Sequence, residues 1–242
     1  MYIAPSSMTN PTTASAGADA LAAPVRRVLN QQTGMLMRHG RTHFFGFWNV
    51  RSLMHEETQA LTMHTLSKYN IDIACLSEAR LPDSGYRRIK VPQHDASYHL
   101  YHSGPTDNSG LHGVAFALND RANASFLAWE PISPRLAHIR LRGSAITISV
   151  IVVYAPILST SDEDKDFYDA LQAVVDRIPA SDILIVAGDW NARTGPSNTT
   201  NDHILGRFAI GNQCANGERL VNFAAANHLT VSTASSSYMV LQ

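Results

Sequence analysis

Seven short runs of apolar and β-branched residues constrain the fold of this chain more than any other feature. They are Phe44–Asn49, Ile71–Ser77, Tyr98–Tyr101, Gly113–Leu118, Arg135–Leu141, Ala145–Tyr154 and Ile183–Gly188. Such runs, bounded by polar segments, are typical of buried strands. The fifth and sixth are joined by Gly143-Ser144, which predicts a hairpin.

Helical spacing of apolar residues appears between some of these runs. Helices are predicted at Met54–Tyr69 and at Glu163–Ile178, where acids crowd the first turn, and a weaker one at Gly217–Asn227. The faces expected to be buried carry Leu61, Leu66 and Tyr69 in the first helix and Phe167, Leu171, Val174 and Val175 in the second. This mixture predicts an α/β fold with antiparallel pairing.

Composition excludes several classes of protein. The 242 residues are 45% apolar, and no apolar run reaches the ~18 residues that a membrane span needs. The two cysteines, Cys75 and Cys214, offer neither a disulfide framework nor a zinc-binding spacing, which favours a reducing, intracellular setting. Disordered, fibrous and membrane classes are therefore excluded, and a globular protein remains.

Residues 1–43 differ from the rest and are expected to form a disordered leader. They are rich in Ala, Ser, Thr, Pro and Gln, and they lack the apolar core of a signal peptide. Their four arginines and single acid leave a transit peptide as the alternative. Without them, 15 basic residues face 19 acidic ones, so any nucleic-acid contact must come from local patches. No repeat or linker divides residues 44–242, which we expect to be one domain.

Polar side chains with hard oxygens end four of the apolar runs. Asn49, Glu78, Tyr154 and Asp189 each stand at or just after the end of a run, and Asn191 follows two residues later. Strand ends lie at the rim of a sheet, so these side chains can converge on one cleft. Two carboxylates with a neutral oxygen suit Mg²⁺ or Mn²⁺, which would offset charge on a phosphodiester transition state.

Each of these residues also has a structural interpretation. An acid at a strand end is usually solvated or caps the next helix, Asn49 can be a turn residue, and Tyr154 can anchor a loop. Only their joint placement favours a catalytic site.

The sequence blocks around these residues resemble those of a known family. The blocks, in order, are Phe47-Trp48-Asn49-Val50-Arg51-Ser52-Leu53, Leu76-Ser77-Glu78-Ala79-Arg80-Leu81, Gly113-Val114-Ala115-Phe116, Val153-Tyr154-Ala155-Pro156 and Gly188-Asp189-Trp190-Asn191-Ala192. As a set, they resemble the endonuclease/exonuclease/phosphatase superfamily. Within it they are similar to the endonuclease domains of non-LTR retrotransposons and to the craniofacial development protein 2-like proteins.

The resemblance implies a four-layer αββα sandwich of the DNase I-like type and Mg²⁺- or Mn²⁺-dependent cleavage of DNA. It implies that Asn49 and Glu78 hold the metal and that Tyr154 contacts the scissile phosphate. Asp189 would orient the attacking water, and Asn191 would donate to the phosphate. Substrate contacts are expected from Asn216, Arg51 and Arg80. Arg51 stands where repair-type nucleases carry an acid, which favours the retrotransposon branch.

The resemblance also places expectations on the carboxy-terminal part. The family continues with further strands and a final Ser-Asp-His, whereas this sequence stops at Gln242. We therefore expect a domain at 44–242 that lacks its C-terminal strands and has impaired or no activity. Asn201-Asp202-His203 resembles the final motif but is expected to be a loop. His112, His138 and His228 show no acid partner in the sequence and are expected to be core or surface residues.

Three functions remain open at this point. The first is a DNA endonuclease of retrotransposon type, monomeric, nuclear and not membrane-bound. The second is a non-catalytic remnant that binds metal or nucleic acid, and the third is a phosphatase for a small substrate. DNA contacts would use some of Arg51, Arg80, Arg87, Arg88 and Lys90, unless residues 80–90 form only a solvated basic loop.

Overall fold

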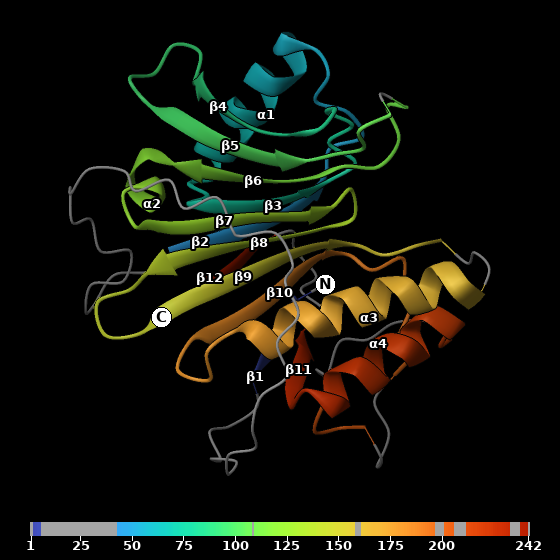
Figure 1. Ribbon diagram of the computed structural model, residues 1–242. Coiled ribbons are helices and arrows are strands. Elements are labelled where there is room, and N and C mark those ends of the chain that lie inside the picture. The colour runs from blue at the N-terminus through green and yellow to red at the C-terminus, as the bar shows by residue number, and fades with distance from the viewer. Residues whose placement is uncertain are drawn as a thin grey trace.

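The apolar runs form two sheets that pack face to face (Figure 1). The computed structural model describes residues 2–5, 43–107, 109–157, 161–196, 201–205, 212–232 and 238–241. Within these ranges, sheet A has the strand order β11 (Leu229–Ser232), β1 (Tyr2–Pro5), β10 (Ile183–Asp189), β9 (Thr147–Tyr154), β8 (Leu136–Arg142), β7 (Phe126–Ser133). Sheet B has the order β12 (Tyr238–Leu241), β2 (His43–Asn49), β3 (Ile73–Ser77), β6 (Val114–Asn119), β5 (Ser97–Ser103), β4 (Ser84–Lys90).

Three apolar clusters hold four layers together. One lies between the sheets and joins residues such as Phe116 of β6 to Val150 of β9. A second packs α1 (Glu56–Lys68) on the outer face of sheet B through Met63 and Leu66. The third packs α3 (Ser161–Arg177) and α4 (Ala215–Ala226) on the outer face of sheet A. The predicted αββα sandwich of the α/β class is confirmed.

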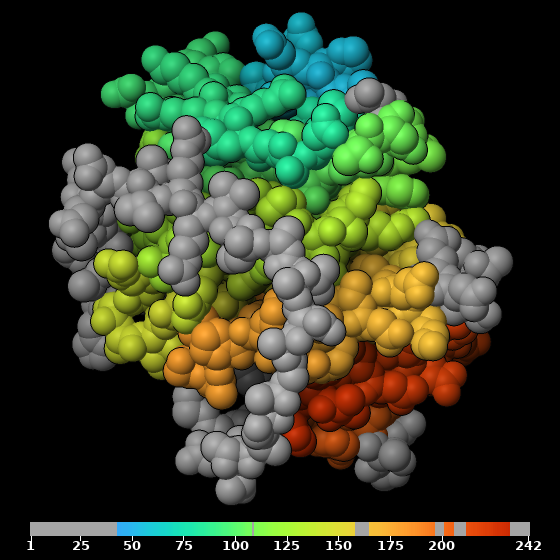
Figure 2. Space-filling view, viewed as in Figure 1, coloured from blue at the N-terminus to red at the C-terminus, as the bar shows by residue number. Residues whose placement is uncertain are grey.

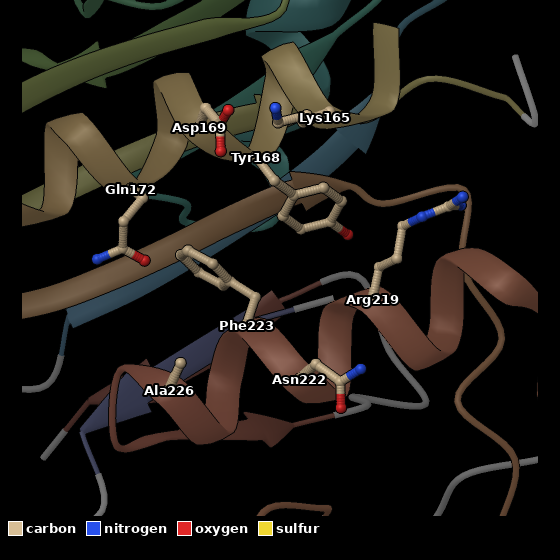
Figure 3. A pocket seen from close by; sticks show the side chains of 8 residues that line it. All are labelled: Lys165, Tyr168, Asp169, Gln172, Arg219, Asn222, Phe223 and Ala226. Carbon is tan, nitrogen blue, oxygen red and sulfur yellow. The ribbon is translucent and has the colours of Figure 1, made fainter. Parts of the chain in front are cut away.

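The outer helices of sheet A lie side by side at the surface, α3 in yellow to orange and α4 in red (Figure 2). Between them runs a groove of about 400 Å³. Tyr168 and Phe223 form its aromatic wall, and Lys165 and Arg219 lie toward one end (Figure 3).

Two parallel strand pairs bring the ends of four strands to the same rim. In sheet B, β2 runs parallel to β3 with Asn49 opposite Ser77. In sheet A, β9 runs parallel to β10 with Tyr154 opposite Asp189. Parallel neighbours end on the same side, which is the arrangement that the strand-end residues predicted. The predicted hairpin is also present, as β8 and β9 joined through residues 143–146.

Several elements differ from expectation. Residues 84–90 form the edge strand β4, paired along its length with β5, instead of a basic loop. The leader is not wholly without structure: Tyr2–Pro5 pairs with β10 and β11, because both strands offer open backbone groups, and His43 already belongs to β2. Residues 6–42 lie outside the described ranges.

The first helix is present, but of its predicted buried face only Leu66 is buried. Met63 and Leu66 are buried together with Gln59 and Thr62, whereas Leu61 and Tyr69 are exposed. Residues spaced by three and four, as 59, 62, 63 and 66 are, share a helix face, and Leu61 lies outside that stripe. None of the helices in the described part of the chain has the length and apolar character needed to cross a membrane.

Candidate active site

Asn49 joins the two carboxylates that the sequence singled out. Its amide nitrogen Nδ2 donates to Glu78 Oε1 at 2.7 Å and to Asp189 Oδ2 at 3.1 Å. Its amide oxygen accepts from the backbone N–H of Arg51 at 3.1 Å. This orientation matches each donor with an acceptor, because both carboxylates accept when ionised. A residue from sheet B thus connects acids from both sheets.

Glu78 has two further donors. The Tyr154 hydroxyl lies 3.3 Å from Oε1, and Arg80 Nη2 lies 3.0 Å from Oε2. Partial burial raises the pKa of Glu78, but the hydrogen bonds from Asn49, Arg80 and Tyr154 and the charge of Arg80 together hold that pKa below its ordinary value. Glu78 is therefore an anion at neutral pH.

Tyr154 is buried, with 6% of its surface exposed. Burial and the charges of Glu78 and Asp189 raise the pKa of its hydroxyl. Two basic side chains lie near its ring, and neither was predicted as part of the site. Arg135 places its guanidinium carbon 5.2 Å from the ring centroid, and the His112 ring centroid is 5.9 Å away. Tyr154 therefore remains a protonated donor beside positive charge.

Asp189 and Asn191 are fixed by a buried tryptophan between them. Trp190 is 2% exposed and packs near Phe223 of α4, with ring centroids 6.3 Å apart. The backbone N–H of Asn191 donates to Asp189 Oδ1 at 3.1 Å, and its side-chain Nδ2 donates to the Ala155 carbonyl at 2.7 Å. One amide hydrogen of Asn191 is thus used to hold the loop after β9.

Asn216 does not lie where a substrate contact was expected. It is 4% exposed and donates from Nδ2 to the carbonyls of Pro156 and Asn191, at 2.8 and 3.2 Å. Arg219 donates to its oxygen at 3.0 Å. The next residue, Gly217, lets the start of α4 pack closely against the Arg193 backbone, because a Cβ there would lie 1.8 Å from the Arg193 carbonyl oxygen. Asn216 therefore holds the Asn191 loop in place through a partly buried hydrogen bond.

The backbone at this rim is unusually strained. Among the described residues, nine that are not glycine have positive φ, and five of them are in or beside the site: Arg51, Glu78, Arg80, His112 and Asn191. Such conformations cost about 1–3 kcal/mol each and cluster at functional sites. The rim is held against this cost by the sheets on either side.

Arg51 lies beside the site, with its side chain exposed next to Asn49. The other predicted residues lie apart, and Arg87, Arg88 and Lys90 are exposed on β4. Asp202 and His203 lie in a turn, about 70% exposed, as the predicted loop requires. His138 does have an acid partner, Glu130, at 3.6 Å. That partner comes from the neighbouring strand β7, which the sequence did not predict.

The donor set fits a hard divalent cation. Glu78 and Asp189 both contact the same nitrogen of Asn49, so their oxygens face a common point. Mg²⁺ takes one or two carboxylates and completes its coordination with water and substrate oxygens. Within the described ranges no three His, Cys, Asp or Glu side chains cluster closely enough to hold a metal by themselves. Water would supply the other ligands, together with the Asn49 amide oxygen once that amide turned from the Arg51 N–H toward the carboxylates.

A protein-family model covers most of the chain. The model of the endonuclease/exonuclease/phosphatase family matches residues 46–227. That range includes the five motif blocks and all the side chains that form the rim.

Two relatives and one solved structure are similar to the chain. Craniofacial development protein 2 of Bos taurus is 30% identical over 187 residues, 77% of this chain and 30% of that protein. The transposon TX1 uncharacterized 149 kDa protein of Xenopus laevis is 31% identical over 106 residues, 42% of this chain and 8% of that protein. The chain thus spans less than a third of the length of either relative. The endonuclease domain of TRAS1, a telomere-specific non-LTR retrotransposon, shares the fold: the TM-score is 0.51, with 14% identity over 77% of this chain and 73% of that domain.

Proposed function

The chain belongs to the endonuclease/exonuclease/phosphatase family, and we propose that it is a metal-dependent phosphodiester hydrolase that cuts DNA, an endonuclease of retrotransposon type. The observation that carries this proposal is the Asn49 amide between the Glu78 and Asp189 carboxylates. The retrotransposon assignment is supported by the similarity to the transposon TX1 protein. With DNA as its substrate, the protein would act in the nucleus. We propose that it is a monomer.

The roles follow from the environment of each side chain. Glu78 and Asn49 would hold Mg²⁺ or Mn²⁺, which when bound stabilises negative charge on the phosphate. Asp189 accepts a hydrogen bond from Asn49 through one oxygen, and it can orient a water and take its proton. Tyr154, kept protonated by its raised pKa, would turn its hydroxyl hydrogen from Glu78 to a phosphate oxygen, and Asn191 donates through its second amide hydrogen. Arg51 and Arg80 contribute positive charge beside the proposed metal site.

One alternative has an observation in its favour. Arg80 already neutralises Glu78 from 3.0 Å, as a side chain would in a protein that binds nucleic acid without cutting it. A bound cation must compete with that ion pair.

Plasmid nicking tests the proposal. Supercoiled plasmid is incubated with the protein in Mg²⁺, in Mn²⁺ and in chelator, and the open circular form is quantified. We expect metal-dependent nicking that falls about 10²- to 10⁴-fold in Asp189→Asn, and by a similar factor in Glu78→Gln. Glu57→Gln is the matched control, because Glu57 is an exposed acid on α1.

Other results would identify the alternatives. DNA binding without nicking under all metal conditions would replace the endonuclease with the binding remnant. Hydrolysis of a small phosphomonoester with no action on plasmid would indicate the phosphatase. Calorimetric titration with Mg²⁺ should show heat that is lost in Glu78→Gln and retained in Glu57→Gln.

A further inference from the structure

A second network of hydrogen-bonded polar side chains lies at the edge of sheet B, where β4 is three strands away from β3. The hydroxyl of Tyr86 on β4 lies 2.7 Å from Nδ1 of His99 on β5. His99 Nε2 lies 3.0 Å from Oδ1 of Asp120. Asp120 begins α2 (Asp120–Asn123), the short helix after β6, at the end of the sheet opposite to the one where β3 ends (Figure 1).

When His99 is neutral, the partners of Asp120 decide which group carries each proton. Burial raises the pKa of Asp120, but hydrogen bonds from His99 and from the Ser97 backbone and the charges of His99 and Arg88 hold it below its ordinary value. The ionised carboxylate only accepts. His99 must therefore donate from Nε2, and in the neutral imidazole Nδ1 is left as an acceptor. Tyr86 then donates its proton to Nδ1.

The exposure of Tyr86 distinguishes this network from one that is wholly buried. Tyr86 is 44% exposed, whereas His99 is 8% exposed beneath it. The buried tyrosines differ, since Tyr98 donates to the Ile71 carbonyl and Tyr101 donates to Asn123. A hydroxyl on an exposed residue, with a buried base behind it and a carboxylate that orients the base, is the arrangement of an activated nucleophile.

We propose that Tyr86 is a base-assisted nucleophile and a site of O-acylation by activated acyl donors. The Tyr86 oxygen forms a bond to the acyl carbon while the bond from that carbon to its leaving group breaks. The phenolic proton passes to His99 Nδ1, and the imidazolium is held by Asp120. The proton then goes from His99 to the leaving group, which restores the neutral base. This site shares none of its residues with the proposed phosphodiester site.

N-acetylimidazole is the probe, because its acyl carbon is activated and its leaving group accepts the proton. The full chain is treated with it, and acetylation of each tyrosine is followed by peptide mass spectrometry, with hydroxylamine reversal to mark phenolic esters. Tyr69 is the internal control: it is 59% exposed, so access alone would make it the faster of the two.

We expect Tyr86 to be acetylated at least tenfold faster than Tyr69. His99→Gln should lower the Tyr86 rate by about 10² while leaving the Tyr69 rate unchanged. Asp120→Asn, which keeps the shape but not the charge, should give a smaller loss and serves if His99→Gln does not fold. Glu78→Gln should leave both rates unchanged. Acetylation of Tyr86 no faster than Tyr69, or a Tyr86 rate that both variants leave intact, would overturn the proposal.

Discussion

Asn216 donates a hydrogen bond to the backbone carbonyl of Asn191, 3.2 Å away, from a position almost closed to solvent. The same amide holds the Pro156 carbonyl. Asn216 therefore ties the loop after β9, which follows Tyr154, to the loop after β10, which carries Asn191.

Asn216→Ala should lower stability and activity together. It leaves buried carbonyls without donors, at a cost of about 1–3 kcal/mol each, and it releases the Asn191 loop. Urea unfolding gives the stability, and plasmid nicking gives the rate. Asn222→Ala, an exposed position on the same helix, is the control and should change neither. A normal nicking rate in a destabilised Asn216→Ala protein would show that the loop keeps its position without Asn216.

Asp182 should make stability depend on pH. Arg140 donates to both of its oxygens, at 2.7 and 2.8 Å, and Ser149 donates at 2.8 Å. Burial raises the pKa of Asp182, but these bonds and the charges of Arg140 and His138 bring it below its ordinary 3.8. The group therefore stabilises the fold above about pH 4, and this contribution is lost as pH falls through the lowered pKa.

Asp182→Asn should reveal that contribution. We expect it to cost about 3 kcal/mol at pH 7, because it breaks an ion pair whose acid is buried, and the difference from the parent should shrink below pH 4. Thermal unfolding between pH 3 and 7 measures it. Asp176→Asn, an exposed acid on α3, is the control. A constant difference across that range would contradict the assigned role.

Gly188→Ala should displace Asp189. A Cβ at Gly188 would lie 1.9 Å from the Val153 carbonyl oxygen, so β9 and β10 would have to separate where the site begins. We expect a loss of at least about 3 kcal/mol and of nicking. Gly46→Ala, whose Cβ would meet only the Ile71 side chain at 3.0 Å, should be milder in urea unfolding. Equal stability of the two variants would refute the expected clash.

Basic residues on the edge strand β4 should contribute to DNA binding without setting sequence preference. Arg87 and Lys90 are exposed there. Each side chain that binds a phosphate contributes about one to the slope of log affinity against log salt. The double variant Arg87→Ala/Lys90→Ala should therefore reduce this slope by about two, measured by fluorescence anisotropy. Lys68→Ala, at the end of α1, is the control. An unchanged slope would indicate a solvated strand.

Local sequence patterns were sufficient for the parts of the site that sit on strand ends. Asn49, Glu78, Tyr154 and Asp189 follow apolar runs, and parallel pairing brings such ends together. Arg135 reaches Tyr154 through the β8–β9 hairpin, which was predicted, although its place in the site was not. The sequence carries no comparable signal for His112, because it reaches Tyr154 from the loop before β6, and this approach depends on how the two sheets pack.

The strand β4 was missed for a related reason. Its sequence Ser-Gly-Tyr-Arg-Arg-Ile-Lys has only two large apolar side chains, and most of it is exposed. It is a strand because its backbone pairs with β5, and edge strands commonly carry charges on their open side. The same charges made it resemble a basic loop.

The place of β1 within sheet A bears on how the protein folds during synthesis. Tyr2 lies opposite Ala187 on one side and Ser232 on the other. β1 is made first but cannot pair until β10 has left the ribosome, and sheet A is complete only when β11 follows at residue 232, although β8 and β9 can pair much earlier. Until β10 emerges, both edges of β1 have no neighbour. Such long-range closure slows folding and leaves a strand open to other chains.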